Sequence, residues 1–333
     1  MSWRVTLVAT AAIGLAAVGP VDGYLKLAVS NGVQNLPARG SRVPIRYFVT
    51  DQSIANVTSS ELAGAVGRAA ATWQAVATSS VAFEFVGFTA APPNAEDGVS
   101  AIGFLNRPDM ERTLAATQFM VDEITGTIVE ADIFFNSSIP WSVAPAGESG
   151  RFDLETIALH EMGHMLGLGH SALGETELRA SGGRRVIAAG AVMFPIASAA
   201  GSVDLRVLQP DDEAGAGDLY PDATFTSRLG SVSGLITKGA QGVEGAHVVA
   251  FHLQTGALIG NFTLDGSGRY AIAGLEPGPY VLRVEPLDDA SVESFFSSAD
   301  DVDLDFRVAY ADRLAIVPRG GGAAAFDIRV IPK

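Results

Sequence analysis

The chain has 333 residues, 48% of them hydrophobic, and carries a formal net charge of −15 at pH 7. This length leaves room for two ordinary domains, each with its own apolar core. The acidic balance, without a basic cluster, argues against nucleic acid as a partner. The sequence contains no cysteine, which excludes disulfides and a lipoprotein attachment site and suits a protein exported by a bacterium.

The first 23 residues have the pattern of a signal peptide. Arg4 precedes an apolar run over residues 5–18, and small residues and Pro20 follow it. We predict that residues 1–23 are removed and that the mature protein is secreted, either extracellular or periplasmic. A membrane anchor is the alternative, but the run is shorter than the about 20 residues that a span requires. We therefore expect no membrane span in the mature chain.

The next segment alternates between strand and helix patterns, which predicts an α/β (α+β) fold. Thr58 and Glu61 form a capping box for a helix that runs to about Thr78, with Val66 and Trp73 on its apolar stripe. Strand patterns lie before and after this helix. We expect strands at residues 43–50, 82–88 and 99–105, followed by a hairpin of strands 113–123 and 127–136.

The run HEMGHMLGLGH begins at His160 and combines residue types that can bind and use a metal ion. On a helix, His160 and His164 stand on the same face, and Gly167 can end that helix so that His170 turns back. Three imidazoles leave a fourth tetrahedral position for water, as in catalytic zinc sites. Glu161, offset by about 100° around the helix, can act as the catalytic general base for that water. The alternatives are a helix that carries three histidines by chance and a purely structural metal site.

A methionine-containing run, AVMFP, follows downstream and holds Met193 and Pro195. Together with Ser171 directly after the third histidine, it resembles the metzincin proteases, and among them the matrixins, the family of the matrix metalloproteinases. The run LQPDD at residues 208–212, which leads into a last helix, fits the same family. The resemblance implies a twisted mixed sheet with an active-site helix, one catalytic zinc, and a peptide or protein substrate. It also implies that Met193 and Pro195 support the zinc site from below, whereas ordinary core packing is the alternative for Met193.

The sequence departs from the matrix metalloproteinases in two respects. Those enzymes usually bind a second, structural zinc through histidines upstream of the motif, and a propeptide cysteine keeps them latent. This chain has no histidine before His160 and no cysteine. We expect neither a second zinc nor a cysteine switch.

Two further expectations concern calcium and substrate. Oxygen ligands could hold a Ca²⁺ ion, but the interpretation that we favour is a set of solvated surface carboxylates; the candidates are Asp97, Asp122, Glu123, Asp132 and Asn136. The resemblance also implies that residues 114–121 form a sheet edge that receives the substrate as an added antiparallel strand. An edge strand without a ligand role is equally open.

From Gly230 onward, short alternating strands are separated by regular turns. We expect strands at residues 231–237, 246–253, 257–264, 270–275 and 280–284, with closing strands at 304–309 and 324–331. The runs GAHVV and GLEPGPY within this region resemble the carboxypeptidase regulatory-like, transthyretin-like β-sandwich. His247 and His252 fall on opposite faces of one strand, so we predict surface histidines and not a metal pair.

The expected organisation is a signal peptide (1–23), a matrixin-like zinc metalloprotease domain (24–224) and an all-β sandwich domain (225–333). The expected function is that of a secreted, monomeric zinc endopeptidase whose sandwich binds a protein or a glycan. The alternative is an exported binding or adhesion protein in which the protease-like domain is a catalytically silent scaffold.

Overall fold

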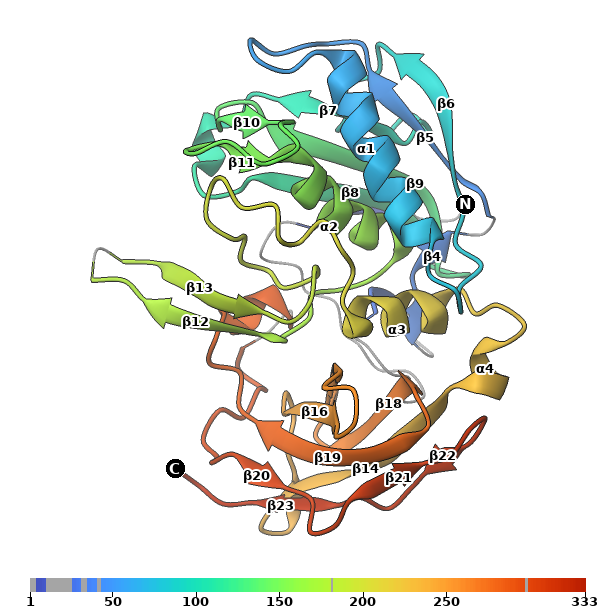
Figure 1. Cartoon of the computed structure of the whole chain (residues 1–333), viewed down its shortest axis with the longest axis vertical. Helices are drawn as coiled ribbons and strands as arrows, with labels where there is room; N and C mark the ends of the chain where they lie inside the picture. Colours follow the sequence, from blue (N-terminus) through green and yellow to red (C-terminus); the bar gives the residue numbers. More distant parts are fainter. Residues whose placement is uncertain (1–3, 10–25, 31–34, 41–42, 181, 297–298) are drawn as a thin grey trace.

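The computed structural model describes residues 4–9, 26–30, 35–40, 43–180, 182–296 and 299–333. Two parts lie one above the other along the long axis of the molecule, a mixed α/β part and a part made of strands (Figure 1). Within the described residues, no helix has both the length and the apolar character needed to cross a membrane.

The α/β part is built on one mixed sheet with the strand order β1-β8-β9-β7-β5-β6, and β4 pairs with β9 at its end. β8 runs antiparallel to β1 and β9, whereas the pairs from β9 to β6 are parallel. The strands are β1 (Arg4–Ala9), β4 (Arg39–Gly40), β5 (Ile45–Thr50), β6 (Phe83–Thr89), β7 (Ala101–Leu105), β8 (Ala115–Asp122) and β9 (Thr127–Asn136). Three small two-stranded sheets join β2 (Ala28–Ser30) to β3 (Asn35–Pro37), β10 (Trp141–Ser142) to β11 (Phe152–Asp153), and β12 (Gly174–Leu178) to β13 (Arg184–Ala189).

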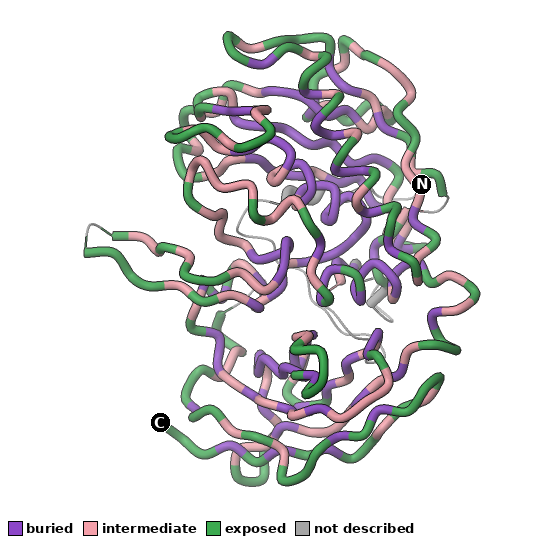
Figure 2. The backbone as a smooth tube through the Cα atoms, in the orientation of Figure 1, coloured by how far each residue is buried: buried purple, intermediate pink, exposed green. Residues whose placement is uncertain are grey.

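Two helices cover one face of this sheet, α1 (Ser59–Gln74) and α2 (Leu154–Leu166) (Figure 1). α1 begins at the expected capping box, in which Thr58 accepts the Glu61 N–H and Glu61 accepts the Thr58 N–H. The buried side of α1 carries Trp73, whose indole Nε1 donates to the carbonyl of Leu159 in α2 at 2.8 Å. This bond fixes α2 against α1, and Figure 2 shows the buried backbone gathered where the two helices meet the sheet.

The order of strands and helices expected from the sequence is observed up to α2. The chain between the third histidine and the methionine run contains a hairpin of β12 and β13. Of the predicted signal peptide, the structure describes Arg4–Ala9 as β1, which pairs antiparallel with the outer edge of β8. The remaining residues of that segment lie outside the described residues, so the signal peptide stays a prediction.

The C-terminal sheets, as we call residues 230–333, are two five-stranded sheets. One contains β14 (Gly230–Lys238), β15 (Gln241–Gly242), β18 (Arg269–Leu275), β22 (Gly322–Ala323) and β23 (Ile328–Val330). The other contains β16 (His247–His252), β17 (Leu258–Phe262), β19 (Gly278–Glu285), β20 (Ala309–Tyr310) and β21 (Ala315–Val317). Residues from both sheets share one buried cluster, including Ile236, Val248 and Leu282. Of the two expected closing strands, the one at 324–331 is observed as the shorter β23, whereas residues 304–308 form no strand and β20 begins only at Ala309.

Helix α3 (Pro210–Leu219) lies between the two parts, and the one-turn helix α4 (Phe225–Arg228) follows it (Figure 1). In α3, the Asp211 carboxylate accepts the Ser171 hydroxyl at 2.6 Å and the Gly260 N–H of β17 at 2.8 Å. Burial raises the pKa of this carboxyl to about 8, with the charge of Asp212 adding to the effect. The Asp211 side chain therefore links the α/β part to the C-terminal sheets. The domain boundary expected after residue 224 stays a prediction.

The prediction of surface histidines in the C-terminal sheets was wrong. His247 and His252 are each only 2% exposed. The His247 ring packs on Phe262 and its Nδ1 lies 3.2 Å from Glu285, whereas the His252 ring packs edge-on against Tyr280. Alternation correctly assigns them to opposite faces of β16, but it does not show that one face meets the α/β part and the other the sheet core.

Candidate metal centre

The helix that carries the first two histidines is defined at both ends. Asp153 caps the N-terminus of α2 by accepting the Thr156 N–H at 2.9 Å. Gly167 ends the helix with a φ of 103°, and a Cβ there would overlap the carbonyl oxygen of Ala38. Glycine is therefore required both by its left-handed backbone and by the close approach of a second chain segment. The chain turns at this point and returns His170 to the helix.

The structure brings His160, His164 and His170 together. In the described part of the chain, these three form the one group of His, Cys, Asp or Glu side chains placed to hold a metal ion, with ligand atoms within 4.8 Å of one another. The Nε2 atom of His164 lies 3.1 Å from that of His160 and 3.2 Å from that of His170. Tetrahedral zinc with bonds of about 2.0–2.1 Å places neighbouring nitrogens about 3.3–3.4 Å apart, so the spacing suits zinc.

Each imidazole is oriented by a backbone carbonyl. The Nδ1 atoms of His160 and His164 lie 2.8 Å from the carbonyl oxygens of Val192 and Leu168. The Nδ1 atom of His170 lies 2.7 Å from the carbonyl oxygen of Ser294. A carbonyl oxygen only accepts hydrogen bonds, so each Nδ1 carries the proton and each Nε2 presents a lone pair to the common centre.

The environment keeps the three imidazoles neutral. Burial lowers the pKa of all three histidines, most strongly that of His164, where the charges of its two neighbours add to the effect. The pKa of His170 falls to about 3. Three converging lone pairs without protons repel one another unless a cation lies between them. The donor set therefore fits a divalent ion that accepts imidazole ligands, such as zinc.

Glu161 lies next to this cluster without belonging to it. Its side chain is buried, and its Oε2 accepts a hydrogen bond from the Thr117 hydroxyl of β8 at 2.7 Å. Burial raises the pKa of Glu161 to about 8, and the Thr117 hydrogen bond opposes that shift. No local pattern in the sequence marks Thr117, because only the packing of α2 on β8 brings the two residues together.

Met193 lies directly beneath α2. It is fully buried, and a Cβ on Gly163 would overlap its sulfur. The Asp212 carboxylate accepts the backbone N–H groups of Val192 at 2.8 Å and Met193 at 3.1 Å, so α3 fixes this turn. The Ser171 N–H also donates to the Met193 carbonyl at 2.9 Å. Met193 thus supports the histidine helix from below, and Pro195 follows in the same turn with partial exposure.

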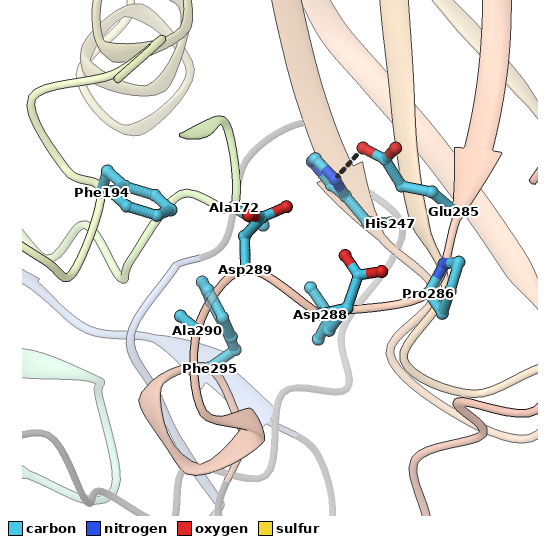
Figure 3. Close-up of a pocket in the computed structure, with 10 residues that line it drawn as sticks. Ala172, Phe194, His247, Glu285, Pro286, Asp288, Asp289, Ala290 and Phe295 are labelled. Atoms are coloured by element: carbon cyan, nitrogen blue, oxygen red, sulfur yellow. Dashed lines mark hydrogen bonds and ion pairs between the residues drawn. The ribbon is translucent and has the colours of Figure 1, made fainter. Parts of the chain in front are cut away.

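The C-terminal sheets contribute to the surroundings of the centre. Phe295 lies beside His170, with ring centroids 6.5 Å apart, and next to Ser294 in the chain. Figure 3 shows the adjoining cavity of about 10 Å³, where Ala172 and Phe194 of the α/β part meet His247, Asp289 and Phe295. This volume leaves room for about one water molecule.

The five candidate calcium ligands do not gather into one cluster. Asp122 accepts the Ile124 N–H at 2.9 Å in the turn after β8, and the Asn136 amide donates to the carbonyls of Arg107 and Met110, in the segment between β7 and β8. Asp132 is 2% exposed and accepts the Ala101 N–H at 2.7 Å, and burial raises its pKa to about 8. Asp132 and Asn136 are therefore buried, which contradicts their interpretation as solvated surface groups. Calcium itself stays a prediction.

Comparison with known proteins supports this description of the centre. Residues 41–178 match the sequence model of the matrixin family, a span that includes all three histidines but ends before Met193. The match supports a matrixin-like zinc metalloprotease domain. No curated protein matches the chain. Among solved structures, the minor pilin GBS52 of Streptococcus agalactiae is similar over 32% of this chain and 45% of its own, with 14% identity and a TM-score of 0.21. The similarity thus spans less than half of the pilin.

Proposed function

We propose that this protein is a zinc-dependent endopeptidase in which Glu161 is the general base. The observation that carries the proposal is the convergence of three neutral imidazoles beside a buried carboxylate that is not itself part of the ligand cluster. A zinc ion at the centre would lower the pKa of a bound water to about 7 and polarise a peptide carbonyl. Glu161 would take the proton of that water and pass it to the leaving amine.

The position of Thr117 supports this role for Glu161. Its hydroxyl lies 2.7 Å from Oε2 and holds the carboxylate in one rotamer. One oxygen is thereby engaged by β8, and the other is left for the proton of the water. A metal site that served stability alone would usually be closed by a fourth protein ligand.

The edge of β8 offers a place for the substrate. β1 pairs with this edge in an antiparallel register from Arg4 opposite Asp122 to Ala9 opposite Thr117. The edge is therefore able to accept an added strand, and once the removal of residues 1–23 frees it, a peptide bound in the same way would run beside Thr117 and Glu161. We propose that peptide substrates bind along β8.

Three further proposals concern the rest of the chain. We propose that residues 1–23 direct export, which N-terminal sequencing of the mature protein would test. We propose that the C-terminal sheets form an accessory β-sandwich of the carboxypeptidase regulatory-like type, able to bind a protein or a glycan. We also propose a monomer, which sedimentation analysis would test.

Replacement of Glu161 tests the chemistry. Glu161→Ala should keep one zinc per chain, because the carboxylate is not a ligand, and should slow peptide cleavage by about 10²–10⁴-fold. Glu155→Gln is the matched control, because Glu155 is a mostly buried carboxylate on the same helix that pairs with Arg68 at 2.5 Å, away from the histidines. Cleavage sites would be profiled by mass spectrometry with a diverse peptide library.

Two outcomes would contradict the proposal in different ways. Undiminished cleavage by Glu161→Ala would refute the role of Glu161. A wild-type protein that binds zinc stoichiometrically but cleaves no peptide would favour the silent-scaffold alternative.

A further inference from the structure

We propose that the C-terminal sheets are part of the metal centre, because residues 287–296 fix the orientation of His170 and thereby raise the affinity for zinc. This inference rests on the proposed zinc binding by the three histidines. It assigns to the C-terminal sheets a role in the site itself, in addition to any partner that they bind.

The first observation is the origin of the hydrogen bond to His170. His160 and His164 are held by carbonyls of the α/β part, whereas His170 is held by Ser294, which is 124 positions away in the sequence. Hydrogen bonds to the outer nitrogen of a ligating imidazole fix its tautomer and its ring orientation, and their loss typically weakens metal binding about 10- to 100-fold.

His170 depends on such a bond more than the other two ligands do. His160 and His164 project from α2, whose ends and flanks are fixed by caps and by packing. His170 follows the end of the helix at Gly167 and belongs to no helix or strand. Its ring is therefore oriented mainly by its immediate contacts, and Ser294 and Phe295 supply two of them.

The segment that contains Ser294 is held in place by the packing of its neighbouring residues. Ser294 ends the short 3₁₀ turn η2 (Val292–Ser294). The next two residues, Phe295 and Phe296, each pack on Phe262 of β17, with ring centroids 5.5 Å apart in both pairs. Ala172 and Ile196 of the α/β part pack against the same buried cluster. The position of the Ser294 carbonyl is thus set by this cluster, which is separate from the core between the two C-terminal sheets.

A second attachment joins the same segment to the α/β part. The Thr176 N–H of β12 donates to the Asp289 side chain at 2.6 Å, and the Thr176 hydroxyl donates to the Asp289 carbonyl at 2.8 Å. Figure 3 shows Asp289 between Ala172 and the chain that leads to Phe295. Residues 287–296 are therefore attached at both ends of their contact with the α/β part, close to His170.

The test measures zinc affinity in the full-length chain. Phe262→Ala and Phe295→Ala remove the aromatic support of the segment, and neither replaces a metal ligand. Phe326→Ala is the matched control, because Phe326 is buried to the same degree as Phe295 (7% and 6% exposed) but packs in the core of the C-terminal sheets beneath Arg313. Zinc affinity would be measured by competition with a chromophoric chelator, and the visible spectrum of the Co²⁺-substituted protein would report the ligand geometry.

We expect both test variants to bind zinc at least about 10-fold more weakly and to change the Co²⁺ spectrum, with Phe326→Ala matching the wild type in both respects. If an alanine variant does not fold, Phe262→Leu and Phe295→Leu keep most of the apolar volume and carry the same test. Folded variants with wild-type zinc affinity and spectrum would overturn the inference. A wild type that binds no zinc would instead refute the proposed function.

Discussion

Gly163 lies in α2 between His160 and His164, where the absence of a side chain leaves room for Met193. A Cβ at this position would overlap the Met193 sulfur and would lie 2.9 Å from the indole carbon Cζ2 of Trp73. Both neighbours are fully buried, so neither can turn into solvent. We therefore expect Gly163→Ala to lower the free energy of unfolding, although alanine is the better helix former.

The magnitude follows from two opposing effects. Replacing a helical glycine by alanine stabilises a helix by about 1 kcal/mol. Forcing an additional methyl group into a packed core costs about 1–3 kcal/mol. Gly67 in the interior of α1 shows the first effect alone, because a Cβ there meets nothing within 4 Å. Gly67→Ala should therefore stabilise the protein, and the two variants should differ by about 2 kcal/mol, which is the cost of the overlap.

Urea unfolding of both variants in the zinc-free state provides the measurement. Adding Met193→Ala removes the overlap with the sulfur but not the close contact with Trp73, so Gly163→Ala should cost less in that background, and the double-mutant cycle should give a coupling energy close to the cost of the sulfur overlap. The reasoning would be refuted if Gly163→Ala and Gly67→Ala changed stability equally, or if Met193→Ala gave no relief.

Two further predictions concern buried carboxylates. The pKa of Asp211 is raised from its ordinary value of 3.8 to about 8, first by burial and then by its acidic neighbour, so the free energy of unfolding should fall as the pH rises between these values. Asp211→Asn should flatten that dependence in urea titrations across this range, and parallel curves for the two proteins would contradict the assignment. Arg206→Gln leaves Asp153, whose side chain is 1% exposed, without the partner at 2.6 Å and should cost about 3–5 kcal/mol at pH 7. Burial tends to raise the pKa of Asp153, but its hydrogen bonds, of which the one from Arg206 is the largest effect, hold that pKa below its ordinary value of 3.8. The stabilisation by the Arg206–Asp153 pair should therefore disappear as the pH falls below that value. Thermal unfolding measures the loss of stability. The exposed pair of Arg46 and Glu84 is the control, since Arg46→Gln should cost less than about 1 kcal/mol. Equal losses of stability in Arg206→Gln and Arg46→Gln would contradict this prediction.

Much of the α/β part could be predicted because its signals are local. The capping box of α1, the glycine that ends α2 and the four-residue spacing of two histidines all act within a turn or two of helix. The alternation of apolar residues placed β5, β7, β8 and β9 in their correct order. Such features depend on neighbours in the sequence, and the sequence shows them directly.

The contacts that complete the site were not predictable in the same way. Thr117 and Glu161 are 44 positions apart, and their hydrogen bond requires α2 to cross β8 at one particular register. The burial of His247 depends on how the C-terminal sheets dock against the α/β part, and no periodicity within β16 encodes that docking. The β12–β13 hairpin could not be predicted, because β12 is short and polar and β13 is two arginines followed by four apolar residues, without the alternation that marks a half-buried strand.

The carbonyls that orient the three imidazoles also define the smallest piece of chain that supplies all the hydrogen bonds of this centre. The matrixin match ends at residue 178 and includes every histidine of the cluster, yet a fragment cut there would lack the Val192 carbonyl that orients His160. A longer fragment that ended after α3 would regain that contact and still lack Ser294. The segment that matches the matrixin family is therefore much shorter than the segment that supplies the hydrogen bonds to the three imidazoles. Truncations of this protein should be planned from these hydrogen bonds and not from the limits of sequence similarity.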